Sequence, residues 1–352
     1  MSDATPLRAD EGRLEALKQE ALQRGRVTGD GVRAAGGPLP PATPSTGYYG
    51  TPLFHEPTWT WEVPLYFFIG GAAGASAIIG LAADMHGLKK LSRDARLVAA
   101  AGSMISGALL VSDLGRPARF LYMLRVFKWR SPMSVGAWTL SSFGAASGMA
   151  ALAILIERPS TGRAVRFLGN GAAAVSALSG AVMTTYTGVL VGATVIPAWA
   201  KSIGTLPPHF GASGVASGVS ILELAGNGEK ALNRLALLAA AAETGAAIHL
   251  ATRTDRSLQP LKMGMTGALT NAGAILSGPV PLALRILGGQ SPRARRLAAV
   301  SSLAGSLLTR FAWVAAGRVS SRHSAIPLKL ENSGSEKKVI ESGSHEITPR
   351  KP

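Results

Sequence analysis

The chain has no cysteine and few charged or aromatic side chains. Of its 352 residues, 16% are charged and 6% are aromatic, and none is Cys. Without thiolates the chain can form no disulfide and can hold neither a cysteine-ligated zinc ion nor an iron–sulfur cluster. No Gly-rich phosphate loop, Ser/His/Asp arrangement or metal-ligand spacing stands out either. Hydrolytic and phosphoryl-transfer chemistry therefore have no support, and we predict no metal site.

Long hydrophobic segments dominate the sequence. Hydrophobic residues make up 47% of the chain, and its mean hydropathy is +0.24. A helix needs about 20 mostly apolar residues to cross the hydrocarbon core of a bilayer. We therefore expect an all-α integral membrane protein, a bundle of eight transmembrane helices within residues 58–317. The expected spans are 63–83, 97–114, 134–156, 168–192, 209–225, 231–251, 264–287 and 297–317.

Polar segments flank this region on both sides. Residues 1–57 are rich in Pro and Gly and have no apolar signal-peptide core, although residues 11–24 suit a short helix. Residues 318–352 are rich in Ser, Glu and Lys. We predict that both tails are largely disordered. Because eight spans are an even number, both tails are expected on the same side of the membrane.

The positive charge lies mainly in the loops between the spans. The formal net charge is +16; the two tails contribute −1 and +3, which leaves +14 for the middle of the chain. The basic residues there form short clusters between apolar runs, a pattern typical of membrane-protein loops that argues against nucleic-acid binding. Twelve Lys and Arg fall on one predicted side and nine on the other. The positive-inside rule thus favours non-cytoplasmic termini for this multi-pass protein, which we expect in the bacterial inner membrane.

Two charged residues fall in the middle of predicted spans. Glu243 lies twelve residues into the sixth span and Arg310 thirteen into the eighth, and both spans start from the same side. At 1.5 Å per residue both side chains sit roughly 18 to 20 Å deep, so we expect them to pair. Such a pair either fixes the packing of the helices or forms a step in a proton path. We take Glu243 and Arg310 as candidates for the proton path.

The histidines argue against a bound haem. A b-type haem needs two histidines at similar depth on adjacent helices, and no histidine falls in the middle of a predicted span. Only His209 and His249 share a predicted side within reach of the membrane, and an interfacial position is the expectation for both. The six histidines are His55, His86, His209, His249, His323 and His345.

Polar and aromatic residues gather where the first four predicted spans reach one face of the membrane. Glu62 and Tyr66 are four residues apart at the start of the first span, so they share one helix face. The second span ends at Asp113, and the fourth carries Tyr186 near its end. Phenols and carboxylates at headgroup depth suit a redox-active quinone, whose carbonyls need donors and whose reduction needs protons. The alternative is an ordinary aromatic belt at the interface.

Four motifs in these segments resemble one family of membrane subunits. Together with a late L-L-T-R-F-A-W-V at 307–314, they resemble the polysulfide reductase membrane-subunit family (NrfD/PsrC) from about residue 48 to residue 317. The motifs are W-T-W-E-V-P-L-Y-F-F-I-G-G-A-A-G at 59–74, D-L-G-R-P at 113–117, S-P-M-S-V-G-A-W at 131–138 and Y-T-G-V-L-V-G-A-T-V-I-P-A-W at 186–199.

The resemblance implies a subunit that performs no bond chemistry alone. It implies an eight-helix membrane anchor without its own metal, bound to an iron–sulfur subunit and a molybdopterin catalytic subunit. The anchor would exchange electrons with menaquinone or ubiquinone as an exchangeable substrate. In the family, residues of the first, second and fourth helices contact the quinone headgroup near the iron–sulfur partner. Carried over to this chain, these positions are Tyr66, Asp113 and Tyr186.

The chain departs from some family members on its first helix. Where those have Asn and His, this chain has Val63 and Tyr66. A phenol can still donate a hydrogen bond to a quinone carbonyl, but its ordinary pKa near 10 makes it a poorer proton donor than His at neutral pH. We therefore hypothesise that Glu62 carries the proton.

The basic residues that follow the second span are candidates for docking the iron–sulfur subunit, or else for contacting lipid headgroups. Two other functions remain open at this stage: a scaffold that does not react with quinone, and an ion or solute transporter with its site in the Gly-interrupted span 209–225. The docking candidates are Arg116, Arg119, Arg125, Lys128 and Arg130.

Overall fold

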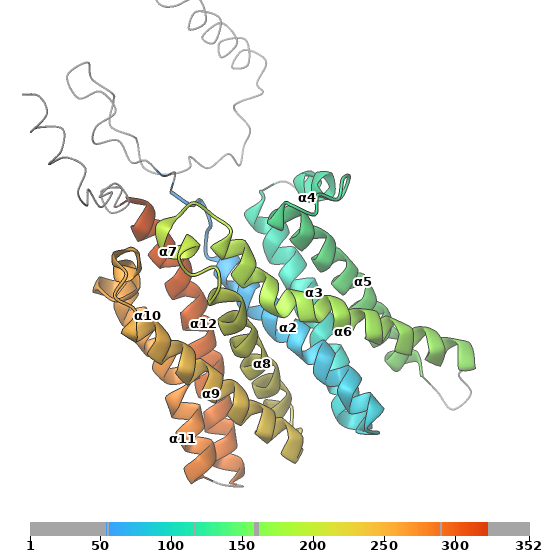
Figure 1. The fold of residues 1–352 in the computed structure, drawn as a ribbon. Coiled ribbons are helices and arrows are strands. Elements are labelled where there is room, and N and C mark those ends of the chain that lie inside the picture. Colours follow the sequence, from blue (N-terminus) through green and yellow to red (C-terminus); the bar gives the residue numbers. More distant parts are fainter. Residues whose placement is uncertain (1–53, 55, 116, 158–161, 289–290, 323–352) are drawn as a thin grey trace, which may run out of the picture.

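The computed structural model describes residues 54, 56–115, 117–157, 162–288 and 291–322. Within these residues every regular element is a helix, and the long helices lie side by side in one bundle (Figure 1). Most of both predicted tails, including the expected helix at 11–24, lies outside the described residues, as does Arg116.

The first half of the bundle is built around α2. This helix packs against α3, α6, α8 and α12, and most of its residues are buried. Its small side chains permit this: a Cβ at Gly74 would lie only 2.4 Å from the carbonyl oxygen of Gly180 on α6. Small residues let helix backbones approach closely where no hydrophobic force drives helices together in lipid. The elements are α2 (Glu62–Met85), α3 (Lys89–Asp113), α4 (Pro117–Met123), α5 (Pro132–Ile156) and α6 (Arg163–Gly192).

The second half packs around α12. This helix contacts α8, α10 and α11, and it also touches α2, which joins the two halves. The elements are α7 (Pro197–Ala200), α8 (Leu206–Leu224), α9 (Lys230–Thr252), the 3₁₀ helix η1 (Arg256–Leu261), α10 (Gly264–Ser277), α11 (Pro279–Leu287) and α12 (Pro292–Arg322).

Seven of the eight expected spans correspond to helical stretches long and apolar enough to cross a membrane, so the described chain is a multi-pass membrane protein. The exception is the expected span 209–225, which corresponds to α8. This helix packs against α2, α6, α9 and α12, so much of its Gly- and Ser-rich surface meets protein and need not be as apolar as a lipid-facing helix.

The two ends of the described chain lie at the same end of the bundle. Arg322, at the end of α12, forms an ion pair of 2.7 Å with Glu56, which precedes α2. At the other end, the Lys90 ammonium at the start of α3 donates to the carbonyl oxygen of Gly226 just after α8, at 3.2 Å. An even number of crossings between Glu56 and Arg322 fits this arrangement.

Some helix limits differ from the sequence expectation. The helix expected at 97–114 begins at Lys89, and the one expected at 297–317 runs from Pro292 to Arg322. Hydropathy marks only the part of a helix that suits hydrocarbon, whereas charged turns continue into the interface.

The seventh expected span is broken at Gly278, between α10 and α11. A Cβ there would lie 2.9 Å from the backbone nitrogen of Thr244 on α9, so only glycine permits this approach. The break therefore lies beside the middle of α9, which carries Glu243. In contrast, α8 is one continuous helix, so the span named for the transporter alternative has no interruption.

Candidate functional site

A largely apolar pocket opens between α2, α3, α5 and α6, at the end of the bundle where the described chain begins and ends. We call it the phenol pocket, because Tyr66 and Tyr186 both line it together with Asp113. Its cavity volume is about 70 Å³. The other lining residues are Trp59, Val63, Phe67, Leu110, Leu114, Met123, Met133, Gly136, Ala137 and Leu190.

The two phenols differ in their hydrogen bonds. The Tyr186 hydroxyl donates to the carbonyl oxygen of Pro132 at 2.6 Å. It can lie there because Gly136 has no side chain, since a Cβ at that position would be 2.0 Å from the Tyr186 hydroxyl oxygen. Tyr66 is buried, and its hydroxyl has no hydrogen bond to another described residue. Tyr66 is thus the phenol whose donor is available to a ligand.

The two carboxylates beside the pocket are connected through Thr60. The Thr60 hydroxyl is within hydrogen-bond distance of Glu62 Oε2, and it lies 3.1 Å from Asp113 Oδ1. A hydroxyl carries one proton and can also accept, so it can donate to one carboxylate while accepting from the other when that one is protonated. Asp113 lines the pocket, whereas Glu62 is buried and does not line it. The arrangement is suited to moving a proton between Asp113 and Glu62.

The local sequence explains the position of these groups. Ser131 caps α5 by accepting from the backbone N–H of Ser134 at 3.4 Å, and Pro132 occupies the first turn, where its missing N–H costs nothing. This cap places the carbonyl of Pro132 next to Tyr186. Trp59 stacks on Trp199 with 5.0 Å between ring centroids, and it holds the segment before α2 against α7.

A second polar site lies in the other half of the bundle. We call His209, Glu243 and Arg310 the charge cluster; they come from α8, α9 and α12. Glu243 Oε1 lies 3.5 Å from His209 Nδ1, and Glu243 Oε2 accepts from Ser277 Oγ at 2.8 Å. Arg310 donates from Nη2 to the carbonyl oxygen of Phe210 at 3.0 Å, and its guanidinium lies 3.7 Å from the centroid of that ring.

The expected direct pairing of Glu243 with Arg310 is therefore wrong: the two residues share one cluster, but no ion pair within 4.0 Å joins them, and His209 is the partner of Glu243. Both are only 1% exposed. Four polar atoms of the cluster are buried without a hydrogen-bond partner among the described residues, and such atoms are costly in a protein interior. They are His209 Nδ1, Glu243 Oε1, Arg310 Nε and Arg310 Nη1.

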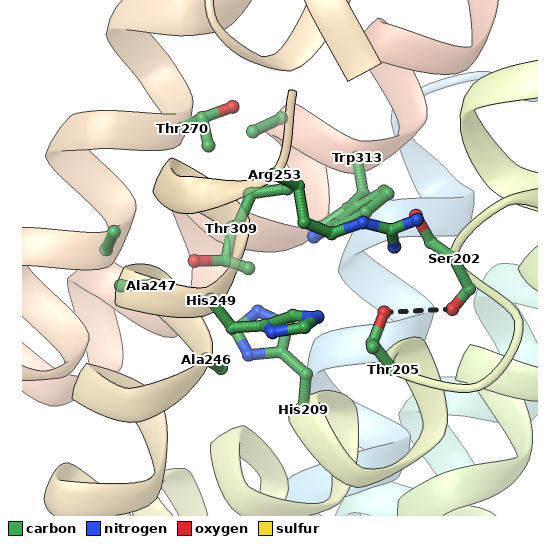
Figure 2. A pocket seen from close by; sticks show the side chains of 13 residues that line it. Ser202, Thr205, His209, Ala246, Ala247, His249, Arg253, Thr270, Thr309 and Trp313 are labelled. Carbon is green, nitrogen blue, oxygen red and sulfur yellow. Dashed lines mark hydrogen bonds between the residues drawn. The ribbon is translucent and has the colours of Figure 1, made fainter. Parts of the chain in front are cut away.

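His209 also lines a narrow pocket next to this cluster. Figure 2 shows His209 and His249 pointing into it from α8 and α9, with Arg253, Thr309 and Trp313 around them. Its cavity volume is about 50 Å³. One water molecule needs roughly 10–15 Å³ of such volume, so there is room for a few waters. We call it the histidine pocket.

The four docking candidates within the described residues lie on and after α4. Arg119 donates to the carbonyl oxygen of Leu114 at 3.2 Å, and the Arg130 guanidinium lies 4.9 Å from the centroid of the Trp129 ring. Arg125, Lys128 and Arg130 are exposed. The same segment exposes large apolar side chains, among them Tyr122, Phe127 and Trp129.

The structure thus brings Tyr66, Asp113 and Tyr186 to one pocket and places Glu62 one hydroxyl away from Asp113. Sequence reasoning did not single out Thr60 or Gly136, since a lone Thr and one more Gly in a Gly-rich chain carry no recognisable signal. It placed His209 at an interface, whereas its ring is in the charge cluster. Among the described residues, no group of three or more His, Asp and Glu is placed to hold a metal ion.

Comparison with known proteins supports the family indicated by the motifs. The curated proteins gave no match to the chain. The sequence pattern of the NrfD polysulfide reductase family matches residues 45–324, which includes every described helix. Because this match covers far more than half of the sequence, the chain belongs to the polysulfide reductase family of membrane subunits.

Proposed function

We propose that this protein is the quinone-reactive membrane anchor of a molybdopterin oxidoreductase complex. The observation that carries the proposal is the phenol pocket, where Tyr66, Asp113 and Tyr186 from three different helices line one cavity. Donors and a carboxylate on largely apolar walls suit a flat, hydrophobic molecule with carbonyl groups at its edge. The quinone, menaquinone or ubiquinone, would be an exchangeable substrate.

Within this pocket the residues have distinct roles. Tyr66 donates to one carbonyl of the quinone, since its hydroxyl has no other described partner. Tyr186 is held by its bond to Pro132, which fixes the phenol at the pocket wall. Asp113 exchanges protons with the quinone, and Thr60 passes them on to Glu62. Reduction of a quinone takes up two electrons and two protons, and this relay supplies or removes the protons.

The electrons come from, or go to, iron–sulfur clusters of a partner subunit. We propose that this subunit docks on the segment from Arg119 to Arg130 and that the molybdopterin catalytic subunit binds beyond it. The segment is exposed, basic and rich in aromatic side chains, as protein interfaces often are. Met123 and Met133 line both the phenol pocket and the hollow formed by this segment, so the docking surface directly borders the quinone pocket.

We further propose that the charge cluster is part of a proton path through the second half of the bundle. His209 and Glu243 have unpaired buried atoms, and the histidine pocket beside them has room for water. The Arg310 guanidinium lies over the face of the Phe210 ring, and its positive charge balances the negative charge of ionised Glu243. In this proposal Glu243 and His209 exchange the proton, and the positive charge of Arg310 helps to position that proton.

Eight crossings fit the helices best, with α8 as the fifth. The ion pair between Glu56 and Arg322 supports this count, because it joins the segment before α2 to the end of α12 on one face, as an even number of crossings would. With the basic loops facing the cytoplasm, the phenol pocket and both termini lie on the outer side of the bacterial inner membrane.

Quinone turnover of the intact complex tests the proposal. Replacing both phenols, Tyr66→Phe with Tyr186→Phe, removes the hydroxyl that donates to the quinone and the Pro132 bond that fixes the pocket wall, so the KM for the quinone should rise about tenfold. Asp255→Asn, a carboxylate at the same end but outside the pocket, is the control. Unchanged quinone kinetics in the double variant would mean that the protein is only a structural anchor. Purification without iron–sulfur and molybdenum subunits would favour a transporter.

A further inference from the structure

A wide, polar pocket opens at the opposite end of the first half of the bundle, where α2 and α5 end and α3 and α6 begin. We call it the basic pocket. Its cavity volume is about 650 Å³, far larger than that of the phenol pocket. The lining residues are Asp84, Lys89, Ser92, Arg93, Arg96, Ala153, Ile154, Leu155, Glu157, Arg166, Gly169 and Asn170.

Positive charge exceeds negative charge in this pocket. Four basic side chains and two carboxylates line it, so the lining has a net charge of +2. Only one of the four cations has a close anionic partner within the described residues, namely Arg96, which lies 2.9 Å from Asp84. Lys89, Arg93 and Arg166 are exposed around it. The pocket therefore attracts an anion.

Arg96 is the one buried cation among the four that line the basic pocket. It is only 6% exposed, although it lies about two turns into α3, whose first residues line the pocket. Its contacts to Asn170 Oδ1 are long, at 3.5 Å, and its Nε is buried without a hydrogen-bond partner. Guanidinium groups have five N–H donors and bind phosphate through pairs of them. A phosphate oxygen would give this guanidinium a further acceptor besides Asp84 and Asn170.

One wall of the basic pocket is apolar and continues towards the lipid. Ala153, Ile154 and Leu155, from the last turns of α5, form that wall. Beyond it, α5 and α6 expose Leu152, Phe167 and other large apolar side chains. A ligand that fits both parts has an anionic head and hydrocarbon tails.

We propose that the basic pocket binds the phosphate headgroup of an anionic phospholipid, with Arg93, Arg96 and Arg166 as its ligands. The pocket lies at the end of the helices, about 36 Å from the start of α2 at 1.5 Å per residue, which matches the headgroup region of the other leaflet. Basic pockets between transmembrane helices on the cytoplasmic side are typical sites for such headgroups. The bound lipid stabilises the joint between α3 and α6, which Arg96 already spans through Asn170.

Native mass spectrometry of the full-length protein, extracted in mild detergent, tests this proposal. The protein is titrated with phosphatidylglycerol, with phosphatidylcholine and with inorganic phosphate in separate series. We expect retention of phosphatidylglycerol at concentrations where phosphatidylcholine is released. In the variant Arg93→Gln/Arg166→Gln the affinity for phosphatidylglycerol should fall about fivefold per arginine. Arg96→Gln should weaken it further.

A matched control separates this site from general surface charge. Lys230→Gln/Arg234→Gln removes two exposed basic residues from the start of α9, at the same end of the bundle but outside the pocket, and should leave lipid retention unchanged. Equal retention of the two lipids, or an unchanged affinity in Arg93→Gln/Arg166→Gln, would overturn the proposal. Binding of inorganic phosphate as tight as that of the lipid would also overturn it, since the ligand would then be free phosphate.

Discussion

The phenol pocket and the charge cluster are both polar sites inside one helical bundle, yet they are built in opposite ways. The phenol pocket has hydroxyls and a carboxylate on apolar walls, and most of its polar groups have a partner. The charge cluster places an acid, an arginine and a histidine in the interior, with four buried atoms that have no hydrogen-bond partner among the described residues. The first arrangement suits a ring-shaped ligand, whereas the second suits water and protons. We therefore propose that the first half of the bundle binds the quinone and exchanges protons with it, whereas the second half carries a separate proton path.

The largest effect should come from Asp113→Asn, because it removes the one carboxylate that lines the phenol pocket. An amide cannot exchange protons, so quinone turnover of the intact complex should fall about a hundredfold. Steady-state kinetics with a soluble quinone measures this. The same loss in Asp255→Asn would show that turnover depends on charge at this end and not on the pocket.

Glu243→Gln should separate the two sites. We expect proton transfer across proteoliposome membranes to fall on the order of tenfold, because the amide cannot carry a proton, while the KM for the quinone stays unchanged. A pH-sensitive dye inside the vesicles reports the transfer. Glu229→Gln, at the start of the same helix, is the control. A raised quinone KM with intact proton transfer would reverse the assignment of the two halves.

Gly136→Ala should disturb the phenol pocket through shape alone. The added methyl group overlaps Tyr186, so the phenol must move and its hydrogen bond to Pro132 is weakened. Because Tyr186 forms part of the pocket wall, the quinone KM should rise about fivefold. Overpacking should also lower stability by about 1–3 kcal/mol. Thermal unfolding and quinone kinetics measure both effects. Gly144→Ala, on the same helix, should cause neither, because an added Cβ there would have no neighbouring heavy atom within 4 Å.

The smallest effect should come from the docking surface. Arg125→Gln/Lys128→Gln/Arg130→Gln leaves both polar sites intact but weakens the affinity for the iron–sulfur subunit, about threefold at low salt and less at high salt. Co-purification of the partner at two salt concentrations measures the loss. A defect that does not depend on salt would contradict an electrostatic role for this segment.

The sequence predicted the helical architecture because hydrocarbon-length apolar segments are a strong signal. The sequence was a weaker guide where a helix is surrounded by other helices, because such a helix need not be strongly hydrophobic. The Gly- and Ser-rich α8 is embedded between other helices, so hydropathy marks it weakly, and the break at Gly278 depends on Thr244 of another helix. Such contacts between helices are not encoded in a local pattern.

The candidate sites show the same division. Tyr66, Asp113 and Tyr186 could be named because they lie in recognisable motifs near helix ends. Thr60 could not, since its importance comes from its position between two carboxylates. Equal depth along α9 and α12 indicated that Glu243 and Arg310 lie near each other, but depth alone could not reveal that His209 is the closer partner of Glu243.

Photolabelling of the intact complex with an azido-substituted quinone tests the proposed division most directly. Peptide mapping by mass spectrometry should find the label on segments of α2 and α6 around Tyr66 and Tyr186, and an excess of unmodified quinone should prevent it. Label on α8 or α9, around His209 or His249, would place the quinone in the histidine pocket and contradict the assignment.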